Sequence, residues 1–99
     1  MSRLVVAMFP IVLLTSPVLA ADAANGKRLA ERWCAACHIV DVQQQRGTTQ
    51  APPFSEAAKR HMDAPALALF LLNPHPKMPD MNLSRTEASD IAAYIVSLR

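Results

Sequence analysis

Both cysteines of this 99-residue chain lie within one run of five residues, Cys34-Ala35-Ala36-Cys37-His38. Two alanines, which favour helix, separate the cysteines, and a histidine follows the second cysteine directly. Side chains three positions apart on a helical turn are neighbours on one side of the backbone. The two sulfurs are therefore expected to face the same way, with an imidazole beside them.

A Cys-x-x-Cys-His run is the attachment signature of c-type haem. In such a site the two sulfurs bond the two vinyl groups of one porphyrin as thioethers, and the histidine binds the iron from one face. The sequence thus predicts one covalently attached haem c, with Cys34 and Cys37 as its anchors and His38 as an axial iron ligand.

Three other interpretations of the run explain less of it. A thioredoxin-like redox pair belongs in a βαβ unit, and no strand-rich, alternating segment surrounds these residues. A zinc site takes four ligands, but His61 and His75 lie far apart without ligand spacing, and we interpret both as surface residues. A plain disulfide accounts for neither His38 nor the two alanines.

The first 20 residues form a separate unit. A basic start at Arg3, an apolar stretch over residues 4–14 and small residues up to Ala20 make the layout of a secretory signal peptide. A retained anchor is the alternative, but residues 4–20 contain Pro10 and Pro17 and are shorter than the about 20 residues that span hydrocarbon. We predict cleavage after Ala20, with a cut after Ala23 as second choice, and export of residues 21–99 to the periplasm without a stable membrane span.

The charge balance excludes nucleic acid as an expected partner. The whole chain has 10 Lys and Arg against 8 Asp and Glu, and loss of Arg3 with the signal peptide reduces this small excess further. The mature chain of about 79 residues is a single domain whose core alone is marginal. A covalent cofactor is one way to stabilise such a domain.

The sequence of the mature chain predicts helices and no strands, because apolar and polar residues do not alternate with period two over any segment. Asp63 with Pro65 starts one helix, and the capping box Ser84-Arg85-Thr86-Glu87 starts the clearest one. Gly26 indicates either a close backbone approach or a simple helix cap. The remaining expectations are a helix over 27–37, a surface loop over 41–54, a short helix over 55–62 capped by Ser55, and an apolar stripe of Ala88, Ile91, Ala92, Ile95 and Leu98.

A proline-rich segment precedes the last helix and carries Met78 between Lys77 and Pro79. Prolines stiffen a segment that has no secondary structure, so that one side chain is held at a fixed reach. Iron bound by histidine on one face is commonly bound by methionine on the other in cytochromes. We predict Met78 as this second axial ligand and interpret Met81 and Met62 as packing residues.

The chain resembles the small class I cytochromes c of bacteria over essentially all of residues 21–99. The residues that carry the resemblance are Gly26, the Cys34-Ala35-Ala36-Cys37-His38 run, Ala51-Pro52-Pro53-Phe54, Met78-Pro79 and Ala93-Tyr94-Ile95.

The resemblance implies an all-α fold of three to four helices around one covalently attached haem. Its N-terminal and C-terminal helices cross, with Gly26 meeting Tyr94, and the carbonyl of Pro52 bonds the second ring nitrogen of His38. The chain departs from the family pattern at Ala30, where an aromatic residue is common, and Trp33 is our candidate for the missing bulk. A second departure is the alanine at position 51, where glycine is usual.

The function that the resemblance implies is periplasmic electron transfer, with iron cycling between Fe(III) and Fe(II), and not enzymatic catalysis. The implied partners are redox proteins: a dehydrogenase as donor and a terminal oxidase or reductase as acceptor. Basic side chains are expected to surround the exposed haem edge and to steer acidic partners, namely Lys27, Arg28, Arg32 and Lys77.

Two other functions stay open at this point. The chain is alternatively a subunit held tightly by a periplasmic dehydrogenase, for instance of sulfite or an alcohol, which would require an apolar patch at the haem edge. A ligand-binding or peroxidase-like haem protein would require a weak or absent bond from Met78 to iron.

Overall fold

The structure, a computed structural model, describes residues 1–2, 4–14, 20–48, 50–60, 62–73 and 78–99. Within these residues the chain forms helices and no strands, which confirms the predicted all-α class. The helices are α1 (Ala23–Trp33), α2 (Phe54–Ala57), α3 (Ala64–Leu72) and α4 (Arg85–Ser97).

Helix α1 begins and ends about four residues earlier than expected. It begins after Asp22, whose carboxylate accepts a hydrogen bond of 3.0 Å from the backbone N–H of Asn25 and so caps the first turn. At the other end, the N–H of Ala35 donates to the carbonyl of Ala30, five residues back, at 3.1 Å. This wider turn ends the helix, so the run that begins at Cys34 is a turn instead of a fourth helical turn.

The two helix starts predicted from capping residues are confirmed. The carboxylate of Asp63 accepts from the N–H of Ala66 at 2.9 Å at the start of α3. The complete capping box of Ser84 and Glu87 opens α4. Helix α2 is shorter than predicted: it ends at Ala57, and Pro53, not Ser55, occupies its cap position.

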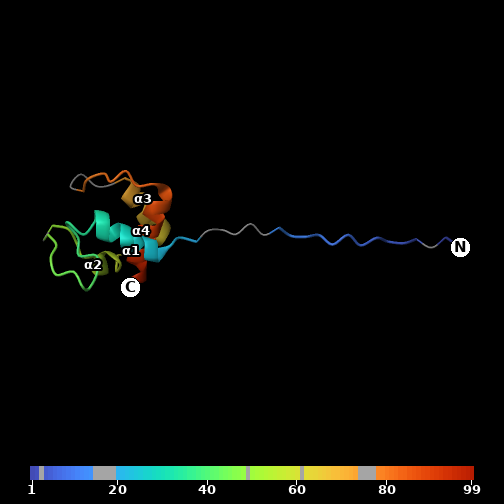
Figure 1. Ribbon diagram of the computed structural model, residues 1–99, viewed down its shortest axis with the longest axis horizontal. Helices are drawn as coiled ribbons and strands as arrows, with labels where there is room; N and C mark the ends of the chain where they lie inside the picture. Colours follow the sequence, from blue (N-terminus) through green and yellow to red (C-terminus); the bar gives the residue numbers. More distant parts are fainter. Residues whose placement is uncertain (3, 15–19, 49, 61, 74–77) are drawn as a thin grey trace.

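Helix α1 crosses α4, and α4 also packs against α3 (Figure 1). Gly26 makes the crossing possible, since a Cβ atom there would lie 1.9 Å from the backbone oxygen of Asp90. This settles the open choice for Gly26 in favour of close approach. The atoms nearest to that Cβ position belong to Asp90 and Ile91, one turn before Tyr94 on α4.

Asp90 is the buried charged residue of this crossing and is 5% exposed. Its two carboxylate oxygens accept from the N–H of Asp22 at 2.8 Å and from the side-chain amide of Asn25 at 2.9 Å. The sequence pattern placed Asp90 outside the apolar stripe of α4. The carboxylate is buried nonetheless, because the N-terminal turn of α1 supplies it with donors.

The core lies where these helices meet and is built from the expected stripe. Ala88, Ile91, Ala92 and Ile95 are buried, and Leu98 is half-buried against them. Ala30 is completely buried, whereas Trp33 is 44% exposed. Trp33 therefore does not supply the bulk that an aromatic residue at position 30 would bring.

The N-terminal residues lie apart from the helices. Residues 4–14 have no secondary structure, are exposed throughout, and extend away from the helical body (Figure 1). Among the described residues, no helix combines the length and the apolar composition that crossing a membrane requires.

Candidate functional site

The predicted attachment residues lie together in one turn directly after α1, residues 34–38, which we call the attachment turn. The carbonyl of Cys34 accepts from the N–H of Cys37 at 3.2 Å and from the N–H of His38 at 2.9 Å. The turn thus brings both cysteines and the histidine into one short stretch of closed backbone. Cys34 is buried and Cys37 is exposed.

Burial raises the pKa of the Cys34 thiol to about 11. A thiol of this kind stays protonated at neutral pH and is a poor nucleophile. In a thioredoxin-like redox pair the reactive cysteine has a lowered pKa instead. The buried surroundings of Cys34 therefore do not favour a reactive thiol at this position.

The imidazole of His38 is prepared for binding a metal by its contact with Pro52. Its Nδ1 lies 2.7 Å from the carbonyl oxygen of Pro52. Because a carbonyl oxygen only accepts hydrogen bonds, Nδ1 carries the proton, and the neutral ring then has its lone pair on Nε2. The contact that the family resemblance implied is present, and the residues of this turn fit a haem iron on Nε2.

Aromatic rings support His38 from behind. The ring of Phe54 lies 5.3 Å from that of His38, and the ring of Tyr94 on α4 lies 6.4 Å from that of Phe54, measured between centroids. The Tyr94 hydroxyl donates to the carbonyl of Val40 at 2.5 Å, and burial raises its pKa. The histidine is thereby connected to the helix crossing through packed side chains.

Met78, the predicted second axial ligand, is half-buried. Of the methionines in the described part of the chain, only Met78 packs against the core. Met81 is half-buried outside that set, and Met62 is 36% exposed. His61, His75 and Lys77, on which other sequence predictions rest, lie outside the described residues.

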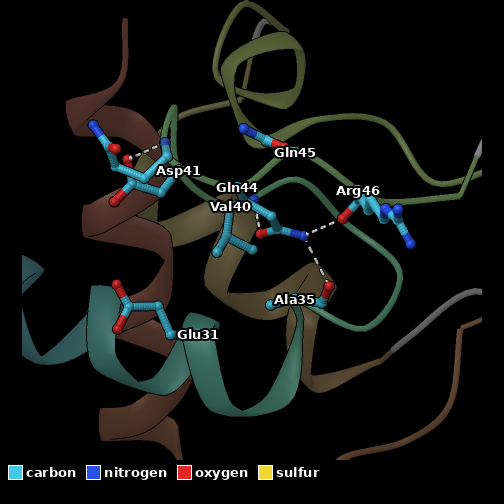
Figure 2. A pocket seen from close by; sticks show the side chains of 8 residues that line it. Glu31, Ala35, Val40, Asp41, Gln44, Gln45 and Arg46 are labelled. Atoms are coloured by element: carbon cyan, nitrogen blue, oxygen red, sulfur yellow. Dashed lines mark hydrogen bonds between the residues drawn. The ribbon is translucent and has the colours of Figure 1, made fainter.

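A polar hollow lies behind the attachment turn (Figure 2). The carboxamide of Gln44 occupies its centre and bonds the backbone of the turn at several points. No sequence pattern pointed to this role. The residues that line the hollow are Glu31, Ala35, Val40, Asp41, Gln43, Gln44, Gln45 and Arg46.

Asp41, which lines this hollow, forms an ion pair with Lys27. The ammonium of Lys27 lies 2.9 Å from a carboxylate oxygen of Asp41. Their hydrogen bond raises the pKa of Lys27 and lowers that of Asp41. Both groups therefore stay charged through the physiological pH range, and one charge offsets the other.

Comparison with known proteins identifies the family. Residues 23–99 match the family model described as Cytochrome c. The chain belongs to the cytochrome c family. This cytochrome is 55% identical over 86 residues to cytochrome c-552 of Bradyrhizobium diazoefficiens, an alignment that covers 86% of this chain and 83% of that protein. No solved structure matches the cytochrome significantly.

The cytochrome is accordingly a small class I c-type cytochrome, a monohaem electron-transfer protein whose haem c is attached covalently. The predicted family, fold, cofactor and electron-transfer function are confirmed. Its partners are redox proteins.

Proposed function

We propose that residues 21–99 act in the periplasm as a diffusing electron carrier. They would take single electrons from a dehydrogenase and deliver them to a terminal oxidase or reductase. The observation that carries the proposal is the 2.7 Å hydrogen bond from His38 Nδ1 to the carbonyl of Pro52, because it leaves Nε2 as the ligand atom.

Four side chains hold the cofactor in this proposal. Cys34 and Cys37 would form the two thioethers, and His38 and Met78 would bind the iron. The bound haem supplies a one-electron couple between ferric and ferrous iron. The carbonyl of Pro52 fixes the plane of the His38 ring and makes Nε2 a stronger base. The soft thioether of Met78 favours the ferrous state and raises the potential.

Helix α1 supports removal of the first 20 residues. Cleavage after Ala20 leaves Asp22 in place, with both its cap of α1 and its backbone bond to Asp90. Cleavage after Ala23 would delete Asp22 and the first residue of the helix. The apolar side chains of residues 4–14 are exposed, so their removal costs no core contact.

Mass spectrometry of the exported protein tests these assignments together. We expect a chain that begins at Ala21 and carries the mass of one haem, which stays attached in acid acetone. The variants C34A and C37A should each lose one of the two thioethers. Haem that acid acetone extracts from the wild-type protein would contradict the attachment, and a chain that begins at Ala24 would contradict the processing site.

A further inference from the structure

We propose that Gln44 is a positioning residue for His38, which holds the backbone of the attachment turn from behind and thereby sets the orientation of the axial imidazole. The inference rests on the proposed role of His38 as an iron ligand. It assigns a task to a residue that lies six positions after the histidine and outside the attachment motif.

The carboxamide of Gln44 bonds four backbone groups of the loop. Its Nε2 donates to the carbonyl oxygens of Ala35 at 2.9 Å, His38 at 2.7 Å and Arg46 at 2.6 Å. Its Oε1 accepts from the N–H of Val40 at 3.0 Å. Figure 2 shows this carboxamide reaching between Ala35 and Arg46. The side chain of Gln44 therefore links the two ends of this loop, at Ala35 and Arg46, to its middle at Val40.

The chemistry of these contacts requires an amide. Three partners are carbonyls, which the two N–H groups of the amide serve by sharing one N–H between two of them, and one is an N–H, which needs an acceptor. Among side chains, only those of Asn and Gln offer two N–H donors and a carbonyl on one rigid plane. Asn is one methylene shorter. Glu keeps the acceptor for Val40 but loses both donors and turns a negative charge toward the carbonyls of Ala35 and His38.

Among the described residues, no donor other than Gln44 bonds the carbonyls of Ala35 and His38. The carbonyl of Cys37 accepts from the N–H of Thr48 at 2.8 Å, and that of Ile39 accepts from the N–H of Phe54 at 2.9 Å. Within the described residues, the carbonyls of Ala35 and His38 receive their side-chain bonds from Gln44. His38 is thus fixed at its ring by Pro52 and at its backbone by Gln44.

The sequence contains its own control. Gln44 is the middle residue of the triplet Gln43-Gln44-Gln45. Gln44 is half-buried, whereas Gln43 and Gln45 are exposed. A substitution at Gln45 changes the same residue type one position away without touching the carbonyls of the attachment turn.

The test compares the haem-loaded variants Q44M, Q44E and Q45M with the wild type by NMR. The ring-proton signals of His38, shifted by the iron, report the orientation of the imidazole. We expect them to move in Q44M and Q44E, which lack the donors, and to stay in place in Q45M. The Val40 amide should exchange roughly tenfold faster in Q44M, which lacks its acceptor, and at nearly the wild-type rate in Q44E.

Protonation of the introduced carboxyl provides a rescue. A neutral carboxylic acid has one O–H donor, so the His38 signals of Q44E should return toward the wild-type positions at acid pH, while those of Q44M should not. Glu31, Asp41 and Arg46 line the same hollow, and Lys27 pairs with Asp41. The wild type and Q44M, measured over the same pH range, account for the titration of these groups.

Two results overturn the inference. If Q44M and Q44E lose stability but keep the wild-type His38 signals, Gln44 is a structural residue without a positioning role. If Q45M moves the signals as far as Q44M, the effect does not come from the carboxamide of Gln44. In both cases the proposed function still stands if the mass of the wild-type protein shows covalently attached haem. A wild-type protein without covalent haem overturns the proposed function, and this inference with it.

Discussion

At the scale of single residues, the site holds His38 through hydrogen bonds at both its ring and its backbone. The carbonyl of Pro52 accepts a hydrogen bond from the Nδ1–H of His38, and the carboxamide of Gln44 donates one to the backbone carbonyl of His38. No buried side-chain nitrogen or oxygen in the described part of the chain lacks a partner. These bonds hold the His38 imidazole in one orientation, which an electron carrier needs because its iron geometry should not change with each electron.

Met78 offers a prediction at this scale. Replacing Met78 by alanine should abolish the near-infrared sulfur-to-iron band of the ferric protein and lower its potential, because a soft thioether ligand is lost. The variant M81A is the matched control and should keep the band, since only Met78 packs against the core among the described methionines. Absorption spectra and redox titration of both variants decide the matter. The opposite pattern would make Met81 the ligand, and retention of the band in both would contradict both assignments.

The site could be predicted from the sequence only where spacing along the chain encodes it. The thiols and imidazole of Cys34, Cys37 and His38 are recognisable because the motif is local. Gln44 is not, because it stands between two identical residues and only the folded loop decides which of the three turns inward. Asp90 was missed for a similar reason: its partners, Asp22 and Asn25, lie more than 60 positions away in sequence.

At the scale of elements, the crossing of α1 and α4 is the contact on which the rest of the fold is arranged. It needs a residue without a side chain at position 26, and it brings the Asp90 carboxylate to the first turn of α1. Tyr94 on α4 then reaches the loop after the attachment turn through the carbonyl of Val40. The position of His38 consequently depends on a helix that follows it by almost fifty residues.

A glycine-to-alanine change at position 26 tests this crossing through the sign of the change in the free energy of unfolding. Helix propensity alone predicts that G26A stabilises the protein by about 1 kcal/mol. The contact at 1.9 Å to the backbone oxygen of Asp90 predicts the reverse, because backbone atoms cannot move aside. We expect the free energy of unfolding to fall by about 3 kcal/mol or more, measured with denaturant on the haem-loaded protein.

Ala24 provides the control for that experiment, because it lies exposed on the same helix. The reverse change A24G should cost about 1 kcal/mol at most, through propensity alone. A stabilised G26A protein would show that the helices tolerate a side chain at their crossing.

Helix boundaries were predictable where the capping signal is local. Asp63 and Ser84 each bond an N–H three residues ahead, so their own sequence neighbourhood specifies α3 and α4. The end of α1 was placed too late, because the run Cys34-Ala35-Ala36-Cys37 favours helix by propensity. Tertiary contacts decide otherwise, since the loop that returns to Cys37 through Thr48 holds this stretch as a turn.

At the scale of the whole molecule, the basic residues of α1 differ in what they offer a partner. Lys27 is paired with Asp41, whose pKa it holds below the ordinary 3.8, so its charge is offset at physiological pH. Arg28 donates to the side chain of Asn25 at 3.5 Å. Arg32 is exposed in the last turn of α1, two residues before Cys34. Of the expected steering residues on α1, Arg32 therefore lies nearest the attachment turn.

Charge reversal at Arg32 tests whether the cytochrome diffuses between partners. An acidic partner attracted by Arg32 should react more slowly with R32E, by several-fold at low salt, because steering acts on the rate of encounter. The difference should shrink toward physiological ionic strength, where the Debye length is about 8 Å.

K59E is the control: Lys59 is exposed, pairs with Glu56 at 3.2 Å and lies outside α1, so its reversal should change the rate far less. Stopped-flow rates across a salt series give both comparisons, with unchanged absorption spectra showing that the iron is unaffected. Two results together would instead identify a fixed subunit with a larger and more apolar contact. The rate would not change with salt or with the Arg32 reversal, and the protein would elute at high salt only together with a dehydrogenase.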